Sequence, residues 1–217
     1  MPRACAVIPA LDAAETVGGV IRDIVSTLQI PALVVDDGST DATGDEARRS
    51  GALVLRHERN LGKGAAIRTG LGCAHRQGFD VALTVDADGQ HPVEAARAVL
   101  FASGDPRALV LGVRDLARDG APRSNRFGNA TSNFFLSHLS GSTLRDTQCG
   151  LRRYPVAETL DLGVRATGYA FEGEVLLRAI SAGLPLVEIG IPVRYPSAAA
   201  HRTHFRLVLD PTRIVAR

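Results

Sequence analysis

Val81-Ala-Leu-Thr-Val-Asp-Ala-Asp-Gly-Gln-His91 is an apolar run of strand character that stops at two aspartates and a Gly-Gln pair. Residues i and i+2 of an extended segment point to the same side, so we expect Asp86 and Asp88 to converge at a strand end. Two close carboxylates repel each other unless a cation lies between them, and Mg²⁺ or Mn²⁺ prefers oxygen ligands. Gln90 would add a neutral oxygen, and substrate phosphates would complete the shell. The pattern predicts a metal–diphosphate site, although a helix-capping turn would use the same residues.

Outward from this stretch, short β-branched runs alternate with helical periods. Strands are expected at residues 4–8, 32–35, 53–56, 81–85 and 109–112, and helices at 17–28, 40–49, 63–77 and 92–102. This alternation predicts an α/β fold with a mostly parallel central sheet and helices on both faces. Ligands of such sheets bind beyond the carboxyl ends of the strands, where the polar loops of this chain fall.

The second half of the chain is less regular. A helix is expected at 123–139, with Phe127, Phe134, Phe135 and Leu139 as its apolar contacts. A polar loop and short strand are expected at 143–154, a helix at 169–182 and a strand at 186–193. The basic segment from residue 196 to 217 has no assignment.

Composition limits the classes of protein that fit. The 217 residues suit one large α/β domain, and the net charge of +2 argues against a dedicated nucleic-acid binder. Cys5, Cys73 and Cys149 are far apart without a Cys-x-x-Cys pair, which indicates a reducing compartment. Neither a signal peptide nor an apolar run approaching about 20 residues is found, so we expect a cytoplasmic protein that meets a membrane only at its surface.

Two other strand ends or helix starts carry chemistry. Asp36 and Asp37 close the second strand, where a carboxylate can bind a base or ribose, or cap a turn. Asn60-Leu-Gly-Lys-Gly64 precedes a helix, where Lys63 and the helix N-terminus favour an anion. The loop is neither a Walker A sequence nor Gly-x-Gly-x-x-Gly, so a simple glycine-rich helix start is the plainer interpretation.

Basic and acidic side chains of the second half are further candidates. Arg114, Arg123 and Arg126 suit phosphate, or form a solvated basic face. Asp146-Thr-Gln-Cys-Gly150 is either a polar turn or part of an acceptor pocket. Glu172 and Glu174 are two apart on a predicted helix, so at most one should reach a site.

Histidines offer a different kind of candidate. His91 and the pair His201/His204 lack the spacing of a zinc site, so we expect surface or packing roles.

In combination, these stretches resemble the family 2 glycosyltransferases of the GT-A fold, over nearly the whole chain and in order. The resemblance rests on Val7-Ile-Pro-Ala-Leu-Asp-Ala-Ala-Glu-Thr16, Val34-Val-Asp-Asp-Gly-Ser-Thr-Asp41, Asn60-Leu-Gly-Lys-Gly64 and Val85-Asp-Ala-Asp-Gly-Gln-His-Pro92. The family usually has Asn-Glu after the first strand, where this chain has Asp12-Ala13.

Later stretches are similar to the dolichyl-phosphate mannose synthase-like branch. They are Gly112-Val-Arg114, Asp146-Thr-Gln-Cys-Gly-Leu-Arg152 and Phe171-Glu-Gly-Glu-Val-Leu-Leu-Arg178. His201-Arg-Thr-His-Phe205 resembles the Arg-x-His-Phe tail of some bacterial members.

The resemblance implies a single GT-A (Rossmann-like) domain over residues 1–217, with a nucleotide-sugar-binding half at 1–113 and an acceptor-binding half and C-terminal tail at 114–217. It implies inverting transfer from a donor such as GDP-mannose or UDP-glucose. Asp86, Asp88 and Gln90 would bind Mg²⁺ or Mn²⁺ on the diphosphate. The implied donor-binding residues are Pro9, Leu11, Glu15, Asp36 and Asp37 for the base and ribose, with Lys63 beside them.

The acceptor decides whether a base is needed. A lipid monophosphate, such as a polyprenyl phosphate, has a second pKa near ~6 and is already a dianion, so it needs only positioning by Arg114, Arg126 and Arg202. A hydroxyl of another lipid or metabolite instead requires a carboxylate base. The candidates for that base are Asp146, Glu172 and Glu174. The arginines favour the phosphate acceptor, reached at the cytoplasmic face of a membrane, and a homodimer is compatible with this reading.

Two other classes of protein share part of the pattern. A sugar nucleotidyltransferase also pairs Asp-x-Asp with Mg²⁺ but attacks phosphorus and releases pyrophosphate. A non-catalytic nucleotide-sugar binder would bind the donor without turnover, and the intact Asp86/Asp88 pair argues against it.

Overall fold

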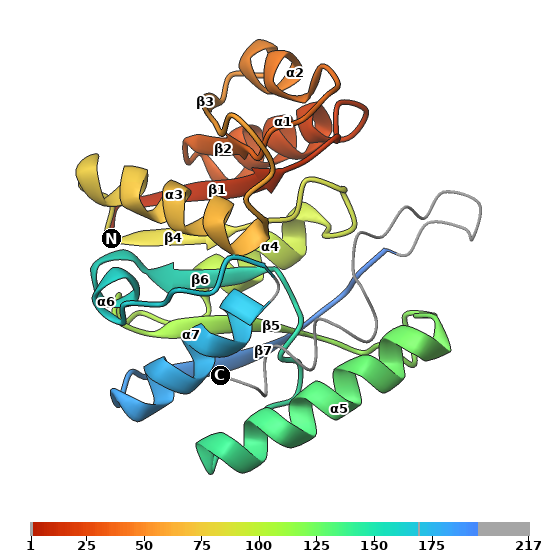
Figure 1. The fold of residues 1–217 in the computed structure, drawn as a ribbon, viewed down its shortest axis with the longest axis vertical. Helices are drawn as coiled ribbons and strands as arrows, with labels where there is room; N and C mark the ends of the chain where they lie inside the picture. The colour runs from red at the N-terminus through yellow and green to blue at the C-terminus, as the bar shows by residue number, and fades with distance from the viewer. Residues whose placement is uncertain (1, 169, 195–217) are drawn as a thin grey trace.

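The centre of the protein is a seven-stranded sheet with strand order β3-β2-β1-β4-β6-β5-β7 (Figure 1). The structure is a computed structural model, and it describes residues 2–168 and 170–194. The strands are β1 (Ala4–Ala10), β2 (Ala32–Asp36), β3 (Leu53–Arg56), β4 (Val81–Thr84), β5 (Leu109–Arg114), β6 (Arg152–Pro155) and β7 (Leu186–Ile191). The expected α/β fold with a mostly parallel sheet is confirmed.

Strand β6 is antiparallel to both of its neighbours, whereas the other strands run in one direction. Its first residue, Arg152, is in register with Thr84 at the end of β4 and with Leu111 in β5. Because β6 begins where β4 ends, the segment that precedes it reaches the carboxyl edge of the parallel strands. Residues 146–151 are thereby placed beside the loop that follows β4.

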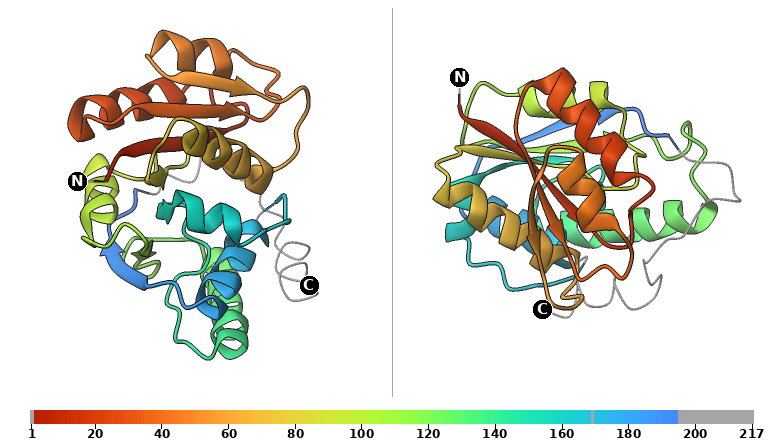
Figure 2. Two further views of the ribbon diagram at one scale, coloured as in Figure 1. Left: turned by 90° about the vertical axis from the view of Figure 1, so that its left-hand side faces the viewer. Right: turned by 90° about the horizontal axis from the view of Figure 1, so that it is seen from above.

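Helices cover both faces of the sheet (Figure 2). One core lies under α1 (Val17–Leu28) and α4 (Val93–Phe101), and it contains Ile21, Ile24 and Val99. The other lies under α3 (Lys63–Arg76) and α7 (Ala170–Ser181), and it contains Ile67 and Phe171. The remaining helices are α2 (Thr43–Arg49), α5 (Arg123–Ser140) and α6 (Val156–Asp161).

The boundaries differ from the predicted ones at a few places. Helix α2 begins at Thr43 instead of residue 40, strand β4 ends at Thr84, and the short helix α6 was not predicted. No helix in the described part of the chain is long and apolar enough to cross a bilayer. The segment 196–217 lies outside the described residues.

The prediction for the apolar side chains of α5 was wrong. Phe127, Phe134, Phe135 and Leu139 are 76%, 67%, 40% and 56% exposed. The buried face of this helix instead carries Gly128, Asn129, Ser132 and Leu136. Small and polar side chains pack there because α5 rests on a polar loop. The hydroxyl groups of Ser132 in α5 and Thr147 in this loop are hydrogen-bonded at 2.8 Å. Helical periodicity predicts which face of a helix is apolar, but it does not predict whether that face is buried.

Candidate active site

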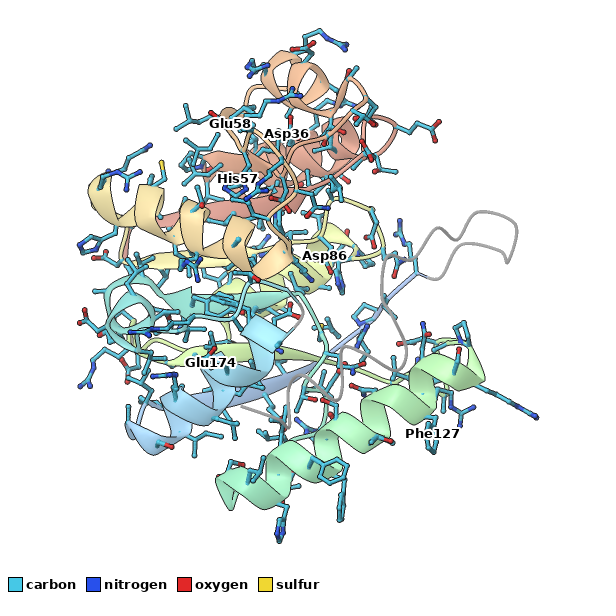
Figure 3. The ribbon with its side chains drawn as sticks, viewed as in Figure 1. Asp36, His57, Glu58, Asp86, Phe127 and Glu174 are labelled. Atoms are coloured by element: carbon cyan, nitrogen blue, oxygen red, sulfur yellow. The ribbon has the colours of Figure 1, made fainter. Side chains whose placement is uncertain are left out.

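Four strands and the start of β6 deliver polar side chains to one edge of the sheet. The loops that follow β1, β2, β4 and β5 leave from the carboxyl ends of those strands, and residues 146–151 lead into β6 there. Asp36 is the last residue of β2, and Asp86 lies two residues beyond the end of β4 (Figure 3). This edge is where open α/β sheets bind ligands.

A cation and two carboxylates from three distant segments meet at the centre of this edge. Lys63 Nζ, at the start of α3, lies 2.7 Å from Asp86 Oδ1 and 3.1 Å from Glu172 Oε1 of α7. The Glu172 side chain is 4% exposed and that of Asp86 is 27% exposed. Lys63 is also the only lysine in the sequence. The compact positive charge of the Lys63 ammonium group therefore compensates the negative charges of the two carboxylates.

The protonation states of the neighbouring groups follow from their surroundings. Burial by itself would raise the pKa of Asp86, but Lys63 and His91 hold that pKa below its usual value, so the carboxylate is ionised. Burial lowers the pKa of His91 to about 4, which leaves the imidazole neutral at pH 7. Its Nε2 lies 3.9 Å from Asp86 Oδ2, and its side chain is only 4% exposed. The expected packing role of His91 is thus fulfilled inside the site.

Asp88 does not continue a strand, so the argument that an extended segment aligns it with Asp86 was wrong. Strand β4 ends at Thr84, and Asp88 lies in a turn where it is exposed. Its Oδ1 accepts a hydrogen bond of 2.9 Å from the backbone N–H of Gln90. The Gln90 carbonyl in turn accepts one of 2.8 Å from Arg194 N–H, which ties the turn to the segment after β7.

The donor set at this turn fits a hard divalent cation. Carboxylates of Asp86 and Asp88 and the amide oxygen of Gln90 are the oxygen ligands that Mg²⁺ and Mn²⁺ prefer. No three His, Cys, Asp or Glu side chains of the described residues gather closely enough to enclose a metal on their own. Such a site needs further oxygens, and phosphates of a substrate are the usual source for Mg²⁺.

Gly150 packs directly against this cluster. A Cβ at this position would lie 2.7 Å from Lys63 Nζ and would overlap the Asp86 carboxylate. The Gly150 carbonyl accepts a hydrogen bond of 2.8 Å from Thr84 Oγ1, which fastens the segment to β4. Glycine is required here for close approach, not for an unusual backbone angle.

Asp37 shapes the glycine-rich loop before α3. Its Oδ2 accepts a hydrogen bond of 2.8 Å from Gly62 N–H, and its Oδ1 accepts one of 3.0 Å from Leu61 N–H. His57 Nδ1 lies 2.6 Å from the same Oδ1 (Figure 3). These contacts orient the loop that presents Lys63.

Asp36 is fully buried and also has partners within the protein. Its Oδ1 accepts a hydrogen bond of 2.9 Å from Ser39 N–H, and its Oδ2 lies 3.2 Å from Arg56 Nη1. The predicted contacts of Asp36 and Asp37 with a base or ribose therefore stay predictions.

The loop after β1 is fastened to the loop after β2 by Asp12. This residue has a left-handed φ of 47°, and its Oδ1 accepts a hydrogen bond of 2.8 Å from Thr40 N–H. Pro9 is buried, Leu11 is half-buried and Glu15 is exposed at the mouth of this loop. The residue that departs from the family pattern thus joins the two loops predicted to hold the nucleoside.

Arg114 and Asp146 form a two-pronged ion pair at the end of β5. Arg114 Nε and Nη2 donate to the two carboxylate oxygens at 2.7 and 3.0 Å, and Arg114 N–H donates to Oδ2 at 3.1 Å. Asp146 is fully buried. Both carboxylate oxygens of Asp146 are thus engaged by Arg114, whose guanidinium they orient. The predicted role of Asp146 as a base stays a prediction.

Glu172 and Glu174 face different ways, as expected. Glu172 lies beside Lys63, whereas Glu174 accepts hydrogen bonds from Ala166 N–H at 2.9 Å and from Arg178 Nε at 2.8 Å. Glu174 thus fastens α7 to the preceding loop, away from Asp86 (Figure 3). Only Glu172 reaches the site.

Arg152 ends one of the stretches that carry the family resemblance, but the sequence indicated no role for it. Its guanidinium is fully buried and donates to the carbonyls of Thr147, Cys149 and Glu172 at 2.7, 2.8 and 2.9 Å. It joins the segment before β6 to α7. No spacing in the sequence marks a residue that is held by three backbone carbonyls.

The other predicted arginines are less defined. Arg126 is exposed in the second turn of α5, and Arg202 lies outside the described residues, as do His201 and His204.

The fold is that of the GT-A glycosyltransferases. Glucosyl-3-phosphoglycerate synthase of Mycobacterium tuberculosis, in complex with Mn²⁺, uridine diphosphate and glucosyl-3-phosphoglycerate, superposes with a TM-score of 0.76 at 24% identity, covering 99% of this chain and 78% of that one. Residues 5–157 match the family described as Glycosyl transferase family 2. The chain belongs to glycosyltransferase family 2, and the prediction of a hexosyltransferase is confirmed.

Curated relatives resemble the chain over most of its length. A polyprenol monophosphomannose synthase of Mycolicibacterium smegmatis is 33% identical over 175 residues, 75% of this chain and 66% of the relative. A UDP-N-acetylglucosamine–dolichyl-phosphate N-acetylglucosaminyltransferase of Methanococcus voltae is 28% identical over 212 residues, 87% of this chain and 84% of the relative.

Proposed function

We propose that this family 2 glycosyltransferase transfers a hexosyl group, with inversion, from a nucleotide-sugar of the GDP-mannose or UDP-glucose type to a polyprenyl phosphate. The observation that carries the proposal is the junction of the Lys63–Asp86–Glu172 cluster and the Arg114–Asp146 pair at one edge of the sheet. The names of the relatives from M. smegmatis and M. voltae, which include polyprenol and dolichyl phosphate, support the acceptor class.

The donor would occupy the half formed by residues 1–113. Pro9, Leu11 and Glu15 from the first loop, with Asp36 and Asp37 from the second, would hold the base and ribose. Lys63 and the N-terminus of α3 would face the diphosphate, because the first N–H groups of a helix favour an anion. The contacts of Asp37 with Leu61 and Gly62 hold that loop in place.

Asp86, Asp88 and Gln90 would hold Mg²⁺ or Mn²⁺, whose chemistry is to stabilise the charge that develops on the departing nucleoside diphosphate. The low pKa of Asp86 keeps its carboxylate ionised for this purpose. Release of Lys63 from Asp86 would let its ammonium group turn to a phosphate oxygen. The fold neighbour from M. tuberculosis has been crystallised with Mn²⁺ and uridine diphosphate, which supports this assignment.

The acceptor half, residues 114–217, would supply positive charge. A phosphate monoester is a dianion at neutral pH, so its oxygen attacks the anomeric carbon without losing a proton. The new C–O bond forms on one face as the bond to the nucleoside diphosphate breaks on the other. Asp146 would hold Arg114 toward the acceptor phosphate, and Arg126 and Arg202 would add to its positioning.

A hydroxyl acceptor is the second candidate. The neighbour from M. tuberculosis carries glucosyl-3-phosphoglycerate, a product without a lipid, so the fold does not choose the acceptor. Glu172 is then the candidate base, since Asp146 and Glu174 have other partners. Its carboxylate is buried and lies 3.1 Å from Lys63 Nζ.

A donor screen by thermal shift, followed by product analysis, tests the proposal. With Mn²⁺ present, one nucleotide-sugar should raise the melting temperature, and polyprenyl phosphate should yield nucleoside diphosphate and a sugar–lipid phosphate. Release of pyrophosphate would instead reveal a nucleotidyltransferase, and binding without turnover would reveal a non-catalytic binder.

Two variants test the roles of the groups. Asp88→Ala should abolish the metal-dependent shift, whereas Asp161→Ala on α6 should not; an unchanged shift in Asp88→Ala removes the metal assignment. Arg126→Ala should impair transfer to lipid phosphate more than donor binding. Equal loss of both would count against an acceptor role for Arg126.

A further inference from the structure

Helix α5 presents an aromatic and basic stripe to solvent. Phe127 and Phe134 are 76% and 67% exposed, and Arg123 is also exposed. Residues 123, 127, 134 and 138 recur at helical spacing and lie opposite the buried Gly128, Asn129, Ser132 and Leu136. Figure 3 shows Phe127 on the side of α5 that faces away from the sheet. We propose that this stripe, formed by Arg123, Phe127, Phe134 and His138, docks the protein on an anionic membrane surface.

Charge identifies the kind of partner. The 18 residues of α5 include two arginines and a histidine but no Asp or Glu. The arginines lie in the first two turns, where the helix dipole favours acidic side chains. Helix stability therefore does not explain them, whereas attraction to an anionic surface does. Phe side chains beside basic groups are the combination found on helices that lie in the plane of a membrane interface.

A second copy of the chain fits this stripe less well. A twofold dimer through α5 would place the same patch on both partners. Two faces that each carry Arg123 and no acidic residue of α5 would then be brought together. Like charges brought together cost free energy, so the stripe suits a partner of opposite charge.

The position of α5 connects the stripe to the site. The helix begins nine residues after Arg114, which ends β5 at the edge of the sheet that carries the candidate active site. Docking through α5 would hold this edge near the headgroup region, where the phosphate of a membrane lipid lies. The inference rests on the proposed function for its purpose, although membrane binding itself is measured without any reaction.

Sedimentation with vesicles tests the inference directly. The wild-type protein should bind vesicles of phosphatidylcholine mixed with phosphatidylglycerol, and should bind much less to phosphatidylcholine alone or at high salt. Arg123→Glu should weaken binding about tenfold or more, since one basic residue near such a surface contributes roughly fivefold and the reversal adds repulsion. Phe127→Gln/Phe134→Gln should weaken binding by a similar factor.

Matched controls exclude general effects of these changes. Phe101→Gln removes an exposed Phe from α4, and Arg97→Glu reverses an exposed charge on that helix; both should bind like wild type. The variants of α5 change exposed residues only and should unfold at the wild-type temperature.

Three outcomes would overturn the inference: no binding of the wild type to the anionic vesicles at low salt, equal binding by the α5 and α4 variants, or a wild-type dimer that the Phe127→Gln/Phe134→Gln change converts to monomer. Transfer to a short polyprenyl phosphate in detergent should survive the double Phe substitution. If no transfer occurs in any variant while vesicle binding follows the pattern above, the proposed function fails and the docking surface stands.

Discussion

Lys63 Nζ lies 2.7 Å from Asp86 Oδ1, so the carboxylate proposed to bind a divalent cation is paired with a cation of the chain itself. The same ammonium group lies 3.1 Å from Glu172 Oε1. A lysine in this position compensates two carboxylates that come from separate elements. Under the proposed function, its ammonium group would turn from Asp86 to a phosphate of the donor.

Removal of this ammonium group should be costly for folding. Lys63→Met leaves the buried Glu172 without its cation, and breaking a buried pair in this way costs about 3–5 kcal/mol. The free energy of unfolding in urea should fall by an amount in that range, and Glu172→Gln in the same chain should recover at least about 1 kcal/mol. Arg97→Met on the surface of α4 is the matched control. If the double variant is no more stable than Lys63→Met alone, Lys63 and Glu172 do not stabilise each other.

The single lysine also permits a chemical test of the site. An amine-acylating reagent can modify only Lys63 and the N-terminus of this chain. Mn²⁺ with a bound nucleotide-sugar should slow acylation of Lys63 several-fold, while the N-terminus reacts at an unchanged rate, as measured by peptide mass spectrometry. Equal rates at Lys63 with and without donor would place the diphosphate elsewhere.

Asp146 should matter for stability and for the acceptor together. Asp146→Asn removes the two-pronged carboxylate that receives Arg114, and we expect a loss of about 3 kcal/mol in the free energy of unfolding. Asp45→Asn breaks the exposed pair with Arg48 and should cost less than about 1 kcal/mol. The KM for polyprenyl phosphate should rise about tenfold or more in Asp146→Asn, with little change in donor affinity. A larger effect on the donor would contradict the proposed orientation of Arg114.

Gly150 tests the close packing behind Asp86. Gly150→Ala would push a methyl group into the Asp86 carboxylate and Lys63. We expect at least about a hundredfold loss of kcat/KM, because small misplacements at a site are costly. Gly190→Ala in β7 meets nothing within 4 Å and should keep full activity. Wild-type activity in Gly150→Ala would show that the cluster is not part of the site.

His91 should make the folded state sensitive to mild acid. Burial lowers its pKa from 6.5 to about 4. Between pH 6.5 and 4, His91 therefore binds a proton in the unfolded chain but not in the folded protein. Stability is therefore full above pH 6.5 and falls as the pH drops toward 4. From pH 6.5 to 5 the wild type should lose about 2 kcal/mol more than His91→Gln in urea unfolding. Parallel loss in both proteins would show that His91 titrates normally.

The first half of the fold was largely predictable. Helix α1 has the period of an amphipathic helix, and strands β1 and β2 are the short apolar runs of buried strands. Such local patterns are readable because short-range side-chain patterning decides which face packs on the core. Helix α5 shows the limit of this argument. Its apolar residues follow the helical period, yet they face solvent, since the helix buries Ser132 and Asn129 against a polar loop.

The sequence by itself determined the family resemblance, the α/β order of elements and the acidic strand ends, because these depend on local spacing along the chain. Only the tertiary structure decided which charges meet. Lys63, Asp86 and Glu172 come from separate elements, and Asp146 reaches Arg114 only because β6 runs against its neighbours. Distances between segments remote in sequence are set by the pairing of strands and by packing, and no periodicity records them.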